Sequence, residues 1–314
     1  MKKMVGFILS VLLVSSTLAG CGQNAASGSS SAASGAASAT TSKSATTDIS
    51  GTITGSGSSA LLPLAQDAAK DFKDKYPNVS ITLNAGGSGD GLKQVSDGSV
   101  NIGNSDVEAS SKLTADQAKE LVDHKVCVVT MAPIVSKDVG ITNLTKEQLI
   151  SIFTAQITNW KDVGGPDEAI VLVTRPTTSG TRALFTQYAL NGNQEASNAA
   201  LETDNSGTLI KSVEQNKGAI GYVALSYLVG DNANQVTAVA IDGAAPTLEN
   251  TYNGKYPVWG YEHMYTKGEA TGAVKEYINF ISSDEYGKKM EGLGYGITAK
   301  MDSSVTSSRD AAAK

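Results

Sequence analysis

Apolar and polar positions along the chain follow two alternating periods, one typical of helices and one typical of strands. A helical spacing of apolar residues covers 61–72, and a strand pattern follows it at 79–83. Later strand patterns cover 126–135, 170–174, 219–223 and 258–265, and later helical patterns cover 115–122, 146–153, 180–190, 208–215 and 272–281. This alternation predicts an α/β fold.

Two apolar, extended stretches are interrupted by proline, 128–135 around Pro133 and 256–265 after Pro257. We interpret them as two strands that cross between lobes and form a hinge. The prediction is a two-lobed fold with a hinge of two crossing strands, although both stretches could also be ordinary core strands of one domain. The predicted parts are lobe 1 at 48–131 plus 259–301, lobe 2 at 132–258, and a polar tail at 302–314.

The N-terminus has the pattern of an export signal, with Lys2 and Lys3 ahead of an apolar run at 5–14. The sequence Leu-Ala-Gly-Cys that ends at Cys21 resembles the lipobox of bacterial lipoproteins, in which the cysteine is acylated. We therefore predict a signal peptide at 1–20 and a lipid anchor on Cys21, on the outer face of the cell membrane. The alternative is a secretory signal with a chance cysteine.

Residues 21–47 are almost entirely Ser, Ala, Gly and Thr after the cysteine, a composition that predicts a flexible tether. Beyond it, Cys127 is the only cysteine, so no internal disulfide is expected. The formal net charge is -6, and it becomes -8 without the signal and its two lysines, which argues against a nucleic-acid partner. His124, His263 and Cys127 lack the spacing of metal ligands, and we expect neither a metal nor a cofactor.

Three Gly/Ser-rich loops lead directly into helical patterns, at 55–60, 86–91 and 175–182. A helix start has backbone N–H groups without partners, and glycine lets the backbone approach a ligand closely. Each loop is therefore a candidate anion site, although Ser and Thr before a helix are often simple caps.

Two charged residues add to the evidence that these loops bind an anion. Arg175 ends the strand pattern 170–174, and its guanidinium could hold two oxygens of a tetrahedral oxyanion. Asp106 would repel a fully ionised ligand but could accept a proton from hydrogen phosphate, which sulfate lacks at neutral pH. The competing interpretations are a solvated arginine and a capping or turn aspartate.

These segments resemble the phosphate-binding proteins of the phosphate-specific ABC transporter, a family of periplasmic-type solute-binding proteins, over about 51–300. The matching motifs are Gly57-Ser58-Ser59-Ala60-Leu61, Gly87-Ser88-Gly89-Asp90-Gly91, Ile102-Gly103-Asn104-Ser105-Asp106, and Arg175 followed by Ser179-Gly180-Thr181. The resemblance implies that a monomeric, non-enzymatic protein binds phosphate between its lobes and delivers it to membrane permease and ATPase subunits. It implies phosphate contacts from Ser58, Ser59, Ala60, Ser88, Asp106, Arg175, Ser179, Gly180 and Thr181.

Other functions remain open at this point. The loop 55–60 matches Gly-x-Gly-x-x-Ala, but the next strand pattern ends at Asn84 rather than at an acid, which argues against a dinucleotide site. A serine hydrolase would need a base beside its nucleophile, and Ser88 lacks the nucleophile-elbow pattern. The stronger alternatives are binding of another oxyanion, such as sulfate or molybdate, and a role in sensing or adhesion.

Overall fold

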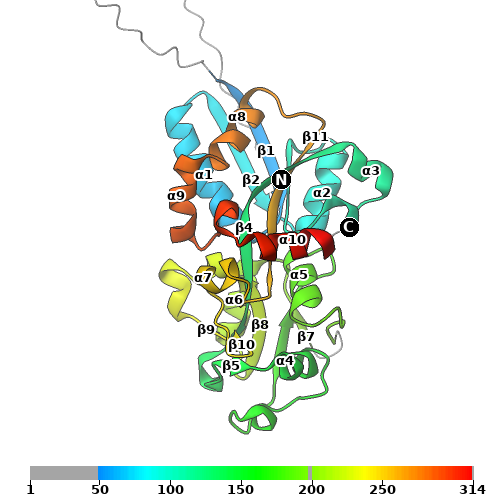
Figure 1. The fold of residues 1–314 in the computed structure, drawn as a ribbon, viewed down its shortest axis with the longest axis vertical. Coiled ribbons are helices and arrows are strands. Elements are labelled where there is room, and N and C mark those ends of the chain that lie inside the picture. Colours follow the sequence, from blue (N-terminus) through cyan, green and yellow to red (C-terminus); the bar gives the residue numbers. More distant parts are fainter. Residues whose placement is uncertain (1–48, 197–199, 313–314) are drawn as a thin grey trace, which may run out of the picture. The chain divides into compact units, whose positions relative to one another are not determined.

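The computed structural model describes residues 49–196 and 200–312 (Figure 1). The predicted signal peptide at 1–20, the lipidation site Cys21 and the tether at 21–47 lie outside the described residues. Within the part that is described, no helix combines the length and the apolar character needed to cross a membrane.

A mixed β-sheet of nine strands forms the centre of the described part of the chain. Its strands join in the order β2-β1-β3-β11-β4-β8-β6-β7, with β9 paired to β4. The strands are β1 (Gly51–Gly57), β2 (Val79–Ala85), β3 (Ile102–Ser105), β4 (Leu121–Val135), β6 (Val171–Thr174), β7 (Ala200–Glu202), β8 (Ala219–Ala224), β9 (Thr237–Ala238) and β11 (Trp259–Lys267). A separate pair consists of β5 (Asn143–Leu144) and β10 (Ala240–Ile241).

The long strand β4 belongs to two groups of strands. Its residues 121–130 pair antiparallel with β11, and its residues 131–135 pair antiparallel with β8. We call β2, β1, β3, β11 and residues 121–130 the first half-sheet, and residues 131–135 with β8, β6 and β7 the second half-sheet. One strand thus runs through both groups, and the link 256–258, in which Tyr256 and Val258 are buried, leads into β11 beside it.

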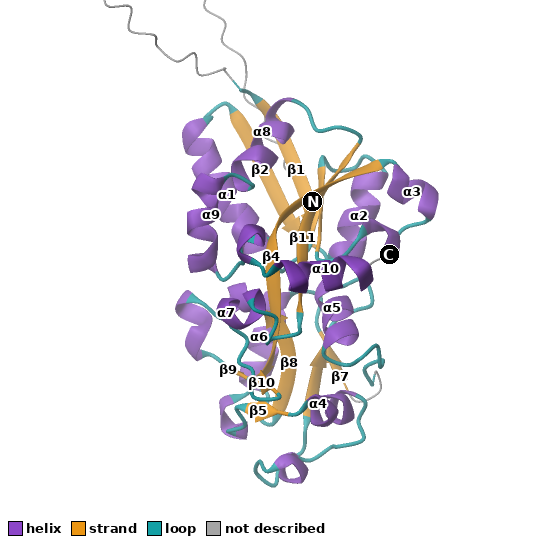
Figure 2. Cartoon of the chain, in the orientation of Figure 1, coloured by secondary structure: helices purple, strands orange, loops and turns teal. Residues whose placement is uncertain are grey.

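Helices cover both faces of the first half-sheet (Figure 2). On one face, α1 (Leu62–Lys75), α8 (Gly272–Ile281) and α9 (Asp284–Met290) pack over Ile53, Ile102 and Met264. On the other face, α2 (Ser88–Ser96) packs against Tyr265 of β11, and α3 (Ala115–Lys119) lies next to it. The apolar spacing of each helix therefore faces the sheet, as its period predicts.

The second half-sheet is also covered on both faces. Its larger core contains α4 (Lys146–Phe153) and α5 (Gly180–Tyr188), where the rings of Phe185 and Tyr222 stack 4.2 Å apart. The opposite face receives Leu209 and Val213 of α6 (Ser206–Gln215). A short helix, α7 (Leu248–Tyr252), precedes the return of the chain to β11.

Besides short elements that were not predicted, such as β3, α7 and α9, the structure differs from the prediction at residues 115–125 and after Met301. The helix predicted at 115–122 ends at Lys119, because residues 121–125 extend β4 and pair with the end of β11. The polar segment after Met301 forms the helix α10 (Ser303–Ala312). Arg309 of this helix lies between the rings of Tyr188 and Trp259, at 3.4 and 4.2 Å from their centres, so α10 is tied to α5 and to β11.

Candidate functional site

The loops that follow the carboxyl ends of five strands meet where the two half-sheets join. They follow β1, β2, β3, β6 and β7, and four of them lead into the N-termini of α1, α2, α5 and α6. In open α/β sheets, ligands bind outside the carboxyl ends of the strands, and helix N-termini favour anions. The topology therefore places four helix N-termini at one location.

The structure brings all nine predicted contact residues together at this location, and all of them are buried. Hydrogen bonds connect the loops of one half-sheet to those of the other. They join Arg175 Nη2 to Ser59 Oγ (3.3 Å), Thr181 Oγ1 to Asp106 Oδ2 (2.8 Å), Gly89 N to the Thr178 carbonyl (2.9 Å) and Lys112 Nζ to the Thr177 carbonyl (2.8 Å).

The first loop turns sharply at Gly57, which has a φ of 130°. A Cβ atom there would lie 2.1 Å from the carbonyl oxygen of Asn104, so only glycine fits. The N–H of Ser58 donates to that same carbonyl (2.8 Å), and its hydroxyl accepts from the N–H of Leu61 (3.0 Å). Ser58 therefore holds the loop in place, while Ser59 and Ala60 lie at the start of α1.

Ser88 is the first residue of α2 and is fully buried. Its hydroxyl oxygen accepts from the backbone N–H of Asp106 (3.0 Å), which leaves the hydroxyl proton available for another acceptor. Gly180 of α5 approaches it so closely that a Cβ atom on Gly180 would lie 2.1 Å from Ser88 Oγ. The second and third loops are thus in direct contact.

Asp106 follows β3 and is only 2% exposed. Its Oδ2 accepts from the hydroxyl of Thr181, whereas its Oδ1 is buried and has no hydrogen-bond partner among the described residues. A buried carboxylate oxygen without a donor is costly, by about 1–3 kcal/mol or more. This oxygen is therefore a position where a ligand proton would be stabilised.

Arg175 follows β6 and is only 1% exposed, so the prediction of a solvated arginine is excluded. It donates to the hydroxyls of Ser59 and Ser206 and to the carbonyls of Thr203 and Asp204, at 2.9–3.3 Å. A guanidinium has five N–H donors, so one of those on Nη1 has no acceptor in the described residues. Burial lowers the pKa of Arg175, an effect that several neighbouring acidic groups oppose.

Arg182 contacts the backbone of Arg175 and a buried glutamate. Its Nη1 donates to the carbonyl oxygen of Arg175, and its Nε lies 3.4 Å from Oε2 of the buried Glu195. Burial raises the pKa of Glu195 to about 7, against the opposing effect of Arg182. Arg182 therefore both holds the third loop and pairs with an acid.

Two residues of the site were missed by the sequence analysis. Ser206 opens α6, and its hydroxyl lies 3.0 Å from that of Ser59. Its setting, Asn205-Ser206-Gly207 ahead of a helical pattern, repeats the design of the three loops and could have identified it. Glu262 is completely buried on β11, and burial together with the charge of Asp106 raises its pKa well above the ordinary value. The sequence feature that could have identified Glu262 is its charge in the middle of a strand predicted to be apolar.

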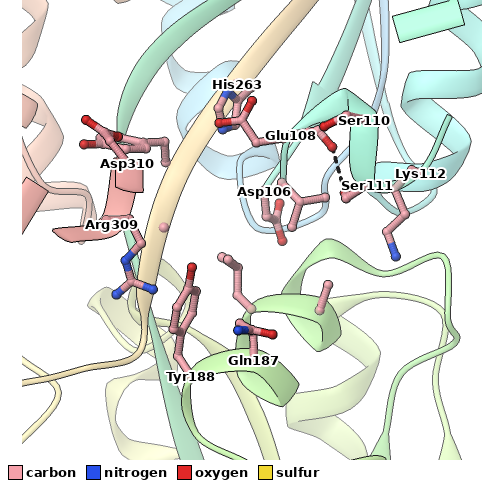
Figure 3. Close-up of a pocket in the computed structure, with 15 residues that line it drawn as sticks. Asp106, Glu108, Ser110, Ser111, Lys112, Gln187, Tyr188, His263, Arg309 and Asp310 are labelled. Atoms are coloured by element: carbon pink, nitrogen blue, oxygen red, sulfur yellow. Dashed lines mark hydrogen bonds between the residues drawn. The ribbon is translucent and has the colours of Figure 1, made fainter. Parts of the chain in front are cut away.

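A cleft of about 420 Å³ adjoins the site on the side of Asp106. Figure 3 shows Asp106 on one wall of this cleft, across from Gln187 and Tyr188 of α5, with Arg309 and Asp310 of α10 at one end. Of the nine predicted contact residues, Asp106 is thus the one that also lines the cleft.

The two histidines take part in other contacts. His124 hydrogen-bonds with the hydroxyl of Thr266 (3.1 Å), and His263 lies 2.8 Å from Asp123. Neither hydrogen-bonds to a serine of the described ranges, so these ranges contain no serine–histidine pair. The described residues also contain no group of three or more His, Cys, Asp or Glu side chains that could hold a metal ion.

Comparison of the sequence with known proteins finds a family model and relatives that match most of the chain. Residues 22–285 match the family model described as "PBP superfamily domain". The chain is 48% identical to the phosphate-binding protein PstS of Bacillus subtilis over 239 residues, which are 76% of this chain and 78% of that protein.

Solved structures agree with this result. A crystal structure from Clostridium perfringens, described as a phosphate ABC transporter substrate-binding protein with bound phosphate, matches with a TM-score of 0.72 and 32% identity, covering 79% of this chain and all of that one. An ABC-type phosphate transport receptor from Vibrio cholerae matches with a TM-score of 0.60 and 28% identity, covering 78% of this chain and 99% of the other. All three relatives are described as binding proteins or transport receptors.

Proposed function

Because the chain belongs to the PBP superfamily and, within it, to the family of the phosphate-binding protein PstS, we propose that it binds inorganic phosphate between its two half-sheets and delivers the ion to an ABC importer. The proposed contacts are the residues already described: the loop 58–60, Ser88, Asp106, Arg175 and the loop 179–181.

Asp106 is the observation that carries this proposal. Its Oδ1 is buried without a donor from the described residues, while the N–H of Asp106 and its Oδ2 bond to the hydroxyls of Ser88 and Thr181. A phosphate that retains a proton can donate to this oxygen, while its other oxygens accept from the helix N-termini and from Arg175. Sulfate has no proton at neutral pH and would place an acceptor against an acceptor. The same carboxylate thus separates two ions of equal shape.

The test uses the variant Asp106→Asn of the purified protein and measures phosphate and sulfate affinity by calorimetry. The carboxamide of the variant can still accept from Thr181 through its oxygen, and its NH₂ group would then present a donor where Asp106 presents an acceptor. We expect the preference for phosphate over sulfate to fall by about 10- to 100-fold, equivalent to about 1.5–3 kcal/mol. Unchanged selectivity would refute the assigned role. Tighter binding of sulfate or molybdate than of phosphate by the unmodified protein would favour another oxyanion as ligand.

This role requires the two half-sheets to separate and close. Ser59, Ser88 and Asp106 come from loops of the first half-sheet, whereas Arg175 and Thr181 come from loops of the second. Only an arrangement with both sets in contact satisfies all oxygens of the ion, so phosphate would shift the population toward closure. Small-angle scattering should show a more compact protein with phosphate than without it.

Delivery and anchoring complete the proposal. Lipid on Cys21 would keep the protein at the outer face of the cell membrane, beside the permease that receives the ion. Uptake of labelled phosphate by cells that express Cys21→Ala protein should fall below that of cells with the unmodified chain, because the variant is no longer retained at the membrane. Release of phosphate from a phosphoester by the purified protein would instead indicate an enzyme.

A further inference from the structure

Glu262 lies in the middle of β11 with a completely buried carboxyl group. In the antiparallel pairing of β11 with β3, His263 opposes Ser105 and Met264 opposes Asn104. Asp106 directly follows Ser105, and Glu262 directly precedes His263, so both residues adjoin the last pair of this ladder. Asp106 is only 2% exposed and Glu262 is completely buried, so both carboxyl groups lie in the buried region beside this pair.

The contact between these two groups requires a proton. Both oxygens of Glu262 and Oδ1 of Asp106 have no hydrogen-bond donor within the described part of the chain. Two ionised carboxylates are both acceptors and repel each other, and buried like charges are strongly disfavoured. When one of the two carries a proton, the same contact becomes a hydrogen bond.

The surroundings assign the proton to Glu262. Asp106 accepts from Thr181, and the positive charges of Arg175 and Lys112 act on it. The ionisable groups that face Glu262 are Asp106, Cys127 of β4, Tyr227 and Tyr295, and none of them is a cation. Burial, together with the charge of Asp106 and a hydrogen bond to it, raises the pKa of Glu262 well above its ordinary value.

We propose that Glu262 is a positioning residue that stays protonated at neutral pH and donates its proton to Asp106. The pair then holds a single negative charge on Asp106, whose oxygens have room for donors from Glu262, Thr181 and a ligand hydroxyl. A second charge at this place would repel an anion. This inference rests on the proposed function, because it explains how Asp106 is kept ready to accept a proton from phosphate.

The protonation state can be measured without any ligand. Because the pKa of Glu195 is also raised, to about 7, the infrared measurement uses the Glu195→Gln protein as its background. At neutral pH this protein should show the C=O stretch of a protonated carboxylic acid, and adding Glu262→Gln should remove it. Glu214→Gln, on the exposed face of α6, is the matched control and should leave the band in place. Absence of the band in the Glu195→Gln protein, or its persistence after Glu262→Gln is added, would overturn the proposal.

Binding measurements test the consequence for the ligand. Glutamine keeps an N–H donor toward Asp106, so Glu262→Gln should bind phosphate within about threefold of the unmodified protein. Leucine has no donor, so Glu262→Leu should bind about tenfold more weakly, the typical effect of one hydrogen bond to a charged group. Equal losses in both variants would contradict the proposed donor. If Glu262→Gln removes the infrared band of the Glu195→Gln protein but the unmodified protein does not bind phosphate, the proposed function is refuted while the protonated pair is supported.

Discussion

Gly180 is the position where the smallest substitution tests the contact between the two half-sheets. A Cβ atom on Gly180 would lie 2.1 Å from Ser88 Oγ and 2.9 Å from the Cβ atoms of both Ser88 and Asp106. Rotation of the Ser88 side chain can move its hydroxyl, but it cannot move either Cβ atom. Gly180→Ala therefore forces α5 away from the first half-sheet.

The cost of this separation can be worked from the contacts. Overpacking by one methyl group costs about 1–3 kcal/mol, and loss of the bond from Thr181 to the Asp106 carboxylate costs about 1.5–3 kcal/mol. Together these terms destabilise the closed arrangement by about 3–6 kcal/mol, or two to four orders of magnitude in affinity. Alanine is otherwise compatible with α5, because it favours helix more than glycine does.

Calorimetric titration with phosphate and thermal unfolding of the ligand-free protein separate the two effects. We expect Gly180→Ala to lose at least about 100-fold in phosphate affinity while its unfolding midpoint changes little. Gly292→Ala is the control, since a Cβ atom there meets nothing within 4 Å. If Gly180→Ala binds phosphate within about threefold of the unmodified protein, the close approach of α5 to Ser88 and Asp106 is not part of the bound state.

Two further predictions concern residues behind the site. Burial raises the pKa of Glu195 from an ordinary 4.5 to about 7. The neutral side chain therefore stabilises the folded protein fully below about pH 4.5, and this contribution to stability is lost as the pH rises through 7. Urea unfolding of the unmodified protein and of Glu195→Gln tests this. Between about pH 4 and pH 8, the free energy of unfolding should fall by about 3 kcal/mol more in the unmodified protein than in the variant. Parallel pH profiles of the two proteins would contradict the prediction. Arg309→Ala removes a guanidinium that lies over two rings and donates to the Pro257 carbonyl (2.9 Å), which should lower the free energy of unfolding by about 2–3 kcal/mol. Arg309→Lys should recover part of this loss in the same urea assay, and an unchanged Arg309→Ala would show that α10 is not held by this contact.

The elements that the sequence predicted best are those with strong local signals. The helices α4 and α8 occupy the predicted ranges 146–153 and 272–281, and Thr145 begins α4 with a capping box closed by Gln148. The first residues of β4 gave no such signal, because Asp123 and Lys125 are exposed and only pairing with β11 makes them a strand. Strands of two or three residues, such as β5 and β9, are too short to show a period at all.

Prediction of the site residues also depended on local sequence signals. Glycines and hydroxyls ahead of helices indicated the three loops, and Arg175 and Asp106 were recognisable as charges that needed a partner. Glu262 could not be assigned a role, because its partner Asp106 lies across a strand pairing between segments more than 150 residues apart. The helix α10 was likewise not predicted, because its residues are mostly small and polar and its contact through Arg309 is made with the distant Tyr188 and Trp259.

The residues that would bind the ion also make the contact between the half-sheets. Arg175 joins Ser59 to Ser206, and Thr181 joins α5 to Asp106, so each side of the site is completed by a group from the other side. In a protein with a net charge of -6, long-range attraction does not explain capture of an anion, and these local donors must supply it. Because the donors are complete only when the half-sheets meet, affinity and closure depend on the same hydrogen bonds, and a substitution that weakens one weakens the other.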